Sequence, residues 1–232
     1  LLRGEEPPQE IEVIEDGVRY GVDVRVGHKT GFYIDQRENR LLAQRLAKEF
    51  KQRTGRGMRA LNCFCYTGGF SLALLAGGAD QVISVDSSAE ALAMAARNAQ
   101  RNGFDEKRTQ WVQADVFEYL RQAREAGETF DLVILDPPKF ASSHRHIERA
   151  ARAYKDINLN GLRLVAPGGD LLTFSCSGAM DVDLFQKVIA GAVIDSKREA
   201  WMIARLGAGA DHPLMMTCPE GEYLKGLQLA LR

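Results

Sequence analysis

The sequence has no apolar run long enough to cross a membrane. No hydrophobic stretch in its 232 residues approaches the roughly 20 residues that a membrane-spanning helix needs. The first residues also lack the pattern of a secretory signal peptide, in which a basic segment precedes an apolar one. We therefore expect a cytoplasmic protein that has no membrane partner.

The sequence also has a small net charge and few cysteines. The formal net charge is −1 at pH 7, so any binding of nucleic acid must rest on local basic patches. The four cysteines show no CxxC pairing and no metal-ligand spacing, and they are too few for a disulfide scaffold. This pattern predicts no metal site and a reducing compartment. The four are Cys63, Cys65, Cys176 and Cys218.

From Met58 onward, strand-like and helix-like segments alternate, which predicts a parallel sheet covered on both faces. The fold class is therefore α/β, a doubly wound and mostly parallel sheet of seven strands. The expected strands are Ala60–Tyr66, Gln81–Asp86, Thr109–Ala114, Phe130–Asp136, Gly169–Cys176, Glu199–Leu206 and Leu224–Leu231. The expected helices between them are Gly69–Ala76, Ala89–Asn102, Val116–Ala126, His144–Val165 and Val182–Asp195.

The N-terminal part has a different pattern. Apolar and polar residues alternate over Glu10–Arg25 around Asp16-Gly17, which is the signal for a type I′ β-hairpin. A linker over Gly27–Gly31 and a helix over Ile34–Lys51 follow. We expect a hairpin and linker region over residues 1–31 and a main domain over residues 32–232. The start at Leu1 predicts that an upstream portion has been removed.

Small and acidic residues follow three successive strands of the first half. Gly68-Gly69 follows the first strand, where the backbone can approach a ligand closely. Asp86 ends the second strand, a position that suits ribose hydroxyls, and Asp115 follows the third. Each residue alone could be a turn glycine or a helix cap, but the succession favours a nucleotide-like cofactor. The absence of GxGxxG argues against a nicotinamide dinucleotide.

Two strands of the second half end in reactive side chains. The segment Phe130–Phe140 contains Asp136 directly before two prolines. The segment Leu171–Ser177 contains Cys176 between two serines. Ligands bind outside the carboxyl ends of parallel strands, so an acid and a thiol should face one cleft. A lone cysteine is more often a small buried apolar residue, yet its position opposite Asp136 favours a nucleophile. We expect Ser175 and Ser177 to order Cys176 by hydrogen bonds.

The order of these motifs resembles a class I S-adenosylmethionine-dependent methyltransferase, which has a Rossmann-like fold. Several further motifs resemble the bacterial 23S rRNA 5-methylcytosine methyltransferases of the large-subunit methyltransferase I type, over nearly the whole chain. That family carries an RNA-binding PUA domain before the hairpin. The resemblance implies S-adenosyl-L-methionine as cofactor and 23S rRNA, naked or in an early assembly intermediate, as partner. A homodimer stays open. The motifs are Phe32–Arg40 (FYIDQRENR), Asp136–Phe140 (DPPKF), Phe174–Gly178 (FSCSG), Asp211–Pro213 (DHP) and Tyr223–Gly226 (YLKG).

The resemblance also implies site residues. Cys176 and Asp136 would be catalytic, with the thiolate adding to carbon 6 of cytosine so that carbon 5 can attack the methyl group. Lys139 stands where many RNA cytosine methyltransferases carry a second cysteine. The expected cofactor residues are Tyr33, Gln36, Arg37, Phe64, Tyr66, Thr67, Gly68, Asp86, Ser87, Asp115, Val116, Phe117, Asp136 and Pro137. The expected substrate residues are Pro138, Lys139, Phe140, Arg145, Arg149 and Arg152.

Two of these expected roles have purely structural alternatives. Arg145, Arg149 and Arg152, here called the arginine stripe, share one helical face and would contact RNA phosphates or be an ordinary solvated surface. Phe140 would stack on a flipped base or pack its loop. Two other functions also remain open. One is an rRNA guanine or adenine N-methyltransferase, since Asp-Pro-Pro motifs also serve nitrogen methylation. The other is a non-catalytic RNA-binding module with a vestigial cofactor pocket.

Overall fold

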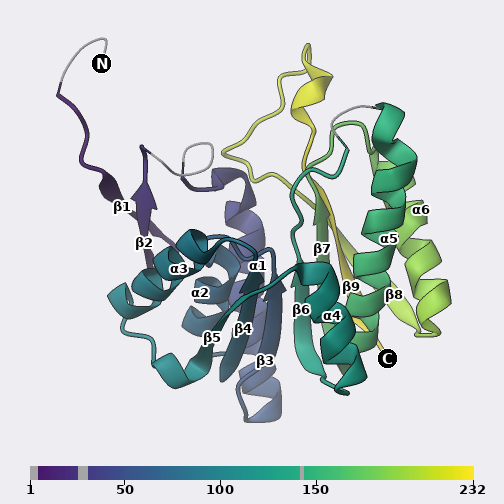
Figure 1. The fold of residues 1–232 in the computed structure, drawn as a ribbon, viewed down its shortest axis with the longest axis horizontal. Coiled ribbons are helices and arrows are strands. Elements are labelled where there is room, and N and C mark those ends of the chain that lie inside the picture. Colours follow the sequence, from purple (N-terminus) through teal and green to yellow (C-terminus); the bar gives the residue numbers. More distant parts are fainter. Residues whose placement is uncertain (1–4, 26–30, 142–143) are drawn as a thin grey trace.

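A seven-stranded mixed sheet is the centre of the computed structural model, which describes residues 5–25, 31–141 and 144–232 (Figure 1). The strand order is β5-β4-β3-β6-β7-β9-β8. The first five strands in this order run parallel to one another, and β9 is antiparallel to both β7 and β8. The predicted fold class is confirmed. The strands are β3 (Arg59–Cys63), β4 (Gln81–Asp86), β5 (Thr109–Gln113), β6 (Phe130–Leu135), β7 (Val165–Ser175), β8 (Ala200–Gly207) and β9 (Lys225–Leu231).

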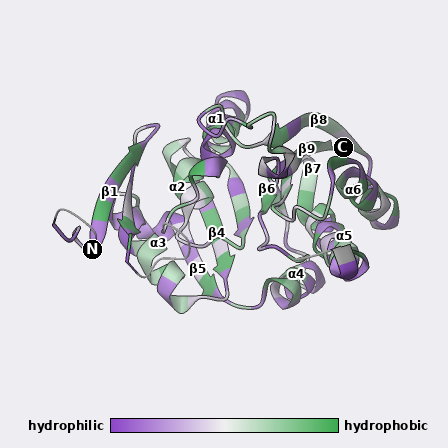
Figure 2. Ribbon diagram, turned by 90° about the horizontal axis from the view of Figure 1, so that it is seen from above, coloured by the Kyte–Doolittle hydropathy of each residue, from purple (hydrophilic) through white to green (hydrophobic). Residues whose placement is uncertain are grey.

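Helices cover both faces of this sheet (Figure 2). Along β6, Leu132 and Ile134 pack into one hydrophobic core, while Val133 and Leu135 pack into the other. Alternate side chains of a strand point to opposite faces, so the apolar run over Leu132–Leu135 is what a doubly covered sheet requires. One face carries α1 (Arg37–Thr54), α2 (Gly69–Ala76) and α3 (Ala89–Arg101). The other carries α4 (Val116–Glu125), α5 (Ile147–Leu164) and α6 (Val182–Ser196).

Two helices begin later than expected because a short 3-10 turn precedes each. Ile34–Gln36 forms η1 before α1, and His144–His146 forms η3 before α5. Helix α5 also ends at Leu164, since Val165 already belongs to β7. Two further 3-10 turns are η2 (Glu106–Arg108) and η4 (Pro219–Gly221).

The N-terminal hairpin is confirmed and packs against the main domain. Strands β1 (Glu10–Glu15) and β2 (Val18–Asp23) meet at Asp16 and Gly17, whose φ angles of 48° and 83° fit a type I′ turn. The Asn98 side chain of α3 accepts from Gly21 N at 2.7 Å and donates to Gly21 O at 3.3 Å. Buried Glu15 binds Arg40 of α1 through two bonds of 2.6 and 2.8 Å. The expected linker lies mostly outside the described residues.

Chain order creates a crevice in the middle of the sheet. From β3 the chain moves outward to β4 and β5, then crosses to β6 on the other side of β3. The loops after β3 and β6 therefore diverge at the carboxyl ends of two neighbouring strands. Such a switch point is where open α/β sheets bind ligands. Within the described ranges, every helix is too short or too polar to cross a membrane.

Candidate active site

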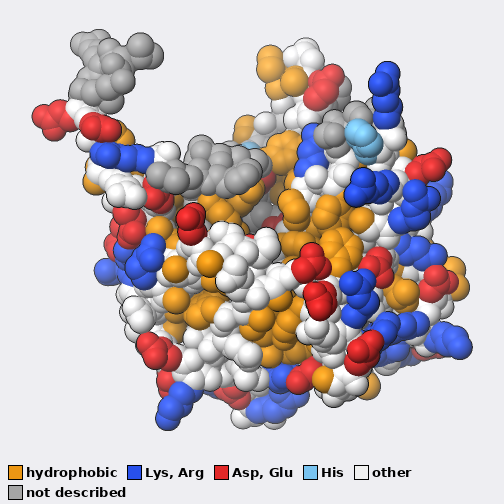
Figure 3. Space-filling view, in the orientation of Figure 1, with side chains coloured by type: hydrophobic (Ala, Val, Ile, Leu, Met, Phe, Trp, Pro, Cys, Tyr) orange, Lys and Arg blue, Asp and Glu red, His pale blue; other side chains and the backbone are white. Residues whose placement is uncertain are grey.

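A cavity of about 710 Å³ opens at this switch point. Its size falls in the range of small-molecule sites. Figure 3 shows hydrophobic side chains gathered beside a hollow between the two halves of the molecule. The cavity brings together most of the residues that the sequence predicted at strand ends. The expected residues that line it are Tyr33, Gln36, Phe64, Tyr66, Thr67, Asp86, Ser87, Asp136, Pro137, Pro138 and Cys176.

The loop after β3 forms one wall of the cavity and has an unusual backbone. Phe64, Tyr66 and Gly68 have φ angles of 60°, 49° and 83°. Positive φ is costly for residues other than glycine, and such strain gathers at functional sites. Strand β3 ends at Cys63, and Cys65 lies in the turn that follows. Cys63 is buried in the core, whereas Cys65 lines the cavity.

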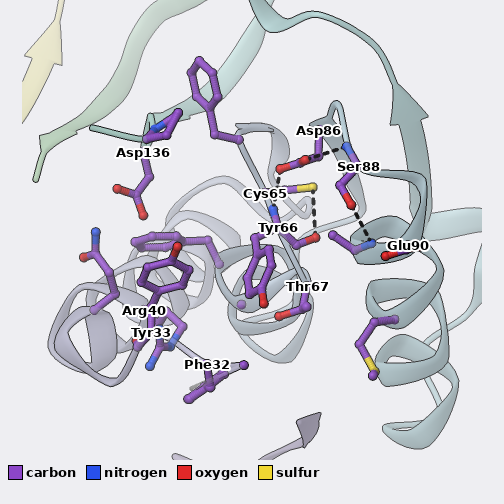
Figure 4. A pocket seen from close by; sticks show the side chains of 18 of the residues that line it. Phe32, Tyr33, Arg40, Cys65, Tyr66, Thr67, Asp86, Ser88, Glu90 and Asp136 are labelled. Atoms are coloured by element: carbon purple, nitrogen blue, oxygen red, sulfur yellow. Dashed lines mark hydrogen bonds between the residues drawn. The ribbon is translucent and has the colours of Figure 1, made fainter. Parts of the chain in front are cut away.

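Asp86 holds this loop in place. Its Oδ2 accepts from Tyr66 N at 2.8 Å, and its Oδ1 accepts from Ser88 N at 2.9 Å (Figure 4). The carboxylate therefore joins the loop after β3 to the start of α3, where Ser88 caps the helix. Asp86 remains half-buried and lines the cavity, so its free lone pairs can accept from the hydroxyls of a bound ligand.

The opposite wall comes from the segment before α1. The ring of Tyr33 meets the ring of Tyr66 edge to face at 5.4 Å (Figure 4). Burial, with the nearby Tyr66 and Asp136, raises the pKa of Tyr33 to about 12, so its hydroxyl stays protonated. Asp35, which the sequence reasoning missed, also lines the cavity. Its Oδ2 accepts from Tyr223 Oη at 2.6 Å, while its buried Oδ1 has no hydrogen-bond partner in the described part of the chain.

Asp136 and Cys176 both line the cavity. Asp136 follows β6 directly, Cys176 follows β7 directly, and these two strands are neighbours in parallel register. The thiol of Cys176 is half-buried and lies 3.9 Å from the carbonyl oxygen of Pro137. Both residues line the same cavity, as the sequence predicted. An acid and a thiol therefore face one bound molecule.

The two serines beside Cys176 bind the hydroxyl of Tyr154. Ser175 Oγ donates to Tyr154 Oη at 2.9 Å, and the Tyr154 and Ser177 hydroxyls are 3.1 Å apart. All three side chains are buried. They fix the turn that carries Cys176 to helix α5. Only tertiary structure brings Tyr154 here, so no local sequence pattern predicted it.

Several expected cofactor residues lie outside the wall of the cavity. Arg37 forms an ion pair with Asp211 at 2.8 Å, and Val116 is buried in the core. Asp115 caps α4 by accepting from Glu118 N at 3.0 Å. The remaining members of this group are Gly68, which precedes α2, and Phe117 on α4.

Of the expected substrate residues, Pro138 lines the cavity. Pro138 and Lys139 are exposed, whereas Phe140 packs on Tyr154 and Phe117 at ring distances of 4.8 and 5.8 Å. This contact favours the loop-packing alternative for Phe140. The arginine stripe is exposed on η3 and α5, and Figure 3 shows Lys and Arg side chains gathered over this part of the surface.

Comparison with protein families gives a match over most of the chain. The family described as S-adenosylmethionine-dependent methyltransferase matches residues 2–206. Among curated proteins, the "Ribosomal RNA large subunit methyltransferase I" of Photobacterium profundum is 51% identical over 226 residues, which are 97% of this chain and 55% of that protein. The protein of the same name from Aeromonas hydrophila is 48% identical, over 100% of this chain and 57% of its own length. The chain thus spans little more than half the length of these relatives.

Solved structures agree with these matches. A SAM-dependent methyltransferase from Streptococcus mutans has a TM-score of 0.85 at 27% identity, over 99% of this chain and 57% of that one. A methyltransferase solved in complex with SAH gives the same TM-score and identity, over 99% and 58%. A methyltransferase from Agrobacterium tumefaciens, at 18% identity and a TM-score of 0.71, over 98% and 71%, supports the fold alone.

Proposed function

This chain belongs to the S-adenosylmethionine-dependent methyltransferase family, and from that premise we propose that it methylates carbon 5 of a cytosine in 23S ribosomal RNA. The observation that carries the proposal is the presence of Cys176 and Asp136 on the wall of one cavity, at the ends of neighbouring strands. A thiol at this point is needed for methylation of a pyrimidine carbon and not for methylation of a nitrogen.

The residues of the cavity fit the cofactor. Asp86 offers carboxylate oxygens to a ribose diol, a role that acids at this strand end commonly have. At the other wall, the unsatisfied Oδ1 of buried Asp35 leaves negative charge that an α-ammonium group would complement. The aromatic rings of Tyr33 and Tyr66 line the space between these two acids. When bound there, S-adenosylmethionine supplies an electrophilic methyl group.

Cys176 would make the cytosine ring reactive. Carbon 5 of cytosine is too weak a nucleophile on its own. The thiolate adds to carbon 6, the new C–S bond pushes electron density to carbon 5, and carbon 5 then takes the methyl group. Asp136 would contact N3 and the exocyclic amine of the base, which holds the ring against the thiol and favours the adduct. Loss of the carbon-5 proton then expels Cys176 and restores the aromatic ring.

RNA recognition would use the surface beside the cavity. The target base must leave its stack to reach Cys176, because the thiol is half-buried. Exposed Lys139 and the arginine stripe provide positive charge next to the cavity mouth for the flanking phosphates. The names of the curated relatives support ribosomal RNA as the substrate class.

Trapping with 5-fluorocytosine tests the proposed chemistry. RNA that carries this base at the target position has no carbon-5 proton to lose, so the adduct cannot resolve. We expect the wild-type protein to become covalently attached to the RNA, and Cys176→Ala to abolish attachment and methylation. Cys176→Ser should also be inactive or nearly so, because a hydroxyl is a far weaker nucleophile at neutral pH.

Cys218→Ser is the matched control, since Cys218 is exposed and lies away from the cavity. That variant should trap and methylate as the wild type does. Methylation that persists in Cys176→Ala would contradict the covalent mechanism. It would instead support direct nitrogen methylation of a purine held by Asp136-Pro137-Pro138, whose motif also suits that reaction.

A further inference from the structure

Lys225 is a buried lysine immediately behind the turn that carries Cys176. It begins β9 and pairs with Ser175, the last residue of β7. Its residue exposure is 5%, and its Nζ donates to the carbonyl oxygens of Ser177 and Met180 at 2.7 and 2.6 Å. Ser177 O also accepts from Met180 N at 3.0 Å. The amine therefore closes the turn that follows Cys176.

A buried lysine is unusual without an ion pair, because the fold must remove an ammonium group from water. Lys225 forms no ion pair with any carboxylate of the described residues, and its two bonds go to neutral carbonyls. Burial lowers the pKa of Lys225, and the groups that oppose this effect are Cys176, Asp181 and Glu222, with Cys176 contributing most. Of these three groups, only Cys176 lines the cavity.

The other groups that face Cys176 come from several elements. The hydroxyls of Tyr33, Tyr154 and Tyr223 interact with it electrostatically, and Asp136 lies on the same cavity wall. Burial raises the pKa of each tyrosine, so these hydroxyls are neutral near pH 7. The Asp136 carboxylate disfavours a second negative charge at the thiol. The cationic groups near this turn are Lys139 and Lys225, and Lys225 donates to the carbonyl oxygens of Ser177 and Met180 within it.

We propose that Lys225 is a positioning residue for Cys176, clamping the turn over residues 177–180 and stabilising the thiolate that adds to carbon 6. The role of this thiolate in catalysis rests on the proposed function. The electrostatic coupling between Lys225 and Cys176 can nevertheless be measured without RNA or methyl transfer. Lys225 itself does not line the cavity.

The alkylation rate of Cys176 by iodoacetamide, followed from pH 6 to 10, tests the coupling. Peptide mass spectrometry locates the label, and Cys218→Ser serves as the background because Cys218 is exposed, whereas Cys63 and Cys65 are buried. Lys225→Gln removes the charge and keeps one donor for the turn, while Lys225→Arg keeps the charge. Lys187→Gln is the matched control, since Lys187 is exposed on α6 and pairs with Asp183.

We expect Lys225→Gln to slow alkylation of Cys176 about tenfold near pH 7 and to move the midpoint of the profile upward by about one pH unit. Lys225→Arg and Lys187→Gln should keep the wild-type midpoint. An unchanged midpoint in a Lys225→Gln protein that still binds the cofactor would overturn the proposal, as would an equal shift in Lys187→Gln.

The wild-type protein provides a test that does not depend on the folding of a variant. A thiol stabilised as thiolate should titrate below the roughly 8.5 of an ordinary cysteine. A wild-type midpoint at or above that value would overturn the proposal. If Lys225→Gln shifts the alkylation midpoint but 5-fluorocytosine trapping fails, the effect of Lys225 on Cys176 is supported and the cytosine mechanism is refuted. If trapping succeeds but the midpoint is unchanged, the cytosine mechanism is supported and the role of Lys225 is refuted.

Discussion

Removal of the Asp86 carboxylate is the most direct test of the cofactor pocket. Asp86 holds Tyr66 N and Ser88 N at 2.8 and 2.9 Å, and it faces the cavity with its remaining lone pairs. A hydrogen bond to a charged acceptor contributes roughly 1.5–3 kcal/mol. If the carboxylate binds ribose hydroxyls, Asp86→Ala should weaken S-adenosylmethionine by about that amount. The dissociation constant would rise roughly tenfold to a hundredfold.

Calorimetric titration with S-adenosylmethionine measures this change, and a thermal melt confirms that the variant is folded. Asp80→Ala is the matched control. Asp80 precedes the same strand, β4, at its other end, and its Oδ2 accepts from Gly57 N at 2.8 Å. Its loss should lower stability and leave cofactor affinity unchanged. Unchanged affinity in a folded Asp86→Ala protein would refute the assignment of Asp86 to the pocket.

Three further predictions concern the RNA surface, acid stability and the Cys176 turn. Replacing the three arginines of the arginine stripe by alanine should reduce the slope of log binding constant against log salt concentration for RNA by roughly two to three units. Replacing exposed cationic residues of α1 should leave that slope unchanged. In the fold, Arg56 binds both Asp131 oxygens at 2.8 Å and, against the effect of burial, lowers the pKa of Asp131. Asp131→Asn should therefore lower the free energy of unfolding at neutral pH by roughly 1–2 kcal/mol, and the difference should fade as the pH falls below about 4. Denaturant melts at several pH values measure it, and a difference that persists at low pH would contradict the assignment. Tyr154→Phe should destabilise the protein by about 1–3 kcal/mol, since it leaves the buried Ser175 hydroxyl without its acceptor, and an unchanged denaturation midpoint would oppose this.

The sequence determined the element order, because local signals and burial patterns agree along this chain. Asp16-Gly17 predicted a tight hairpin, and positive φ at both residues is what such a turn requires. Ser88 accepts from Ala91 N at 3.1 Å and caps α3, and serine directly before a helical run is typical of such a cap. The alternation of strand-like and helix-like segments from Met58 onward predicted a sheet covered on both faces. Motif order then led to the correct family.

Tertiary structure decided how side chains that are far apart in the sequence meet. The chain reversal after β3 at positive φ carries Cys65 into the cavity, and no local pattern predicts positive φ at Phe64 or Tyr66. Tyr154 and Lys225 come from α5 and β9, yet both bind the turn around Cys176. Their positions depend on strand register and helix packing, which combine contacts from the whole chain. The sequence alone therefore identified the acid and the thiol, whereas the surroundings that set their chemistry required the fold.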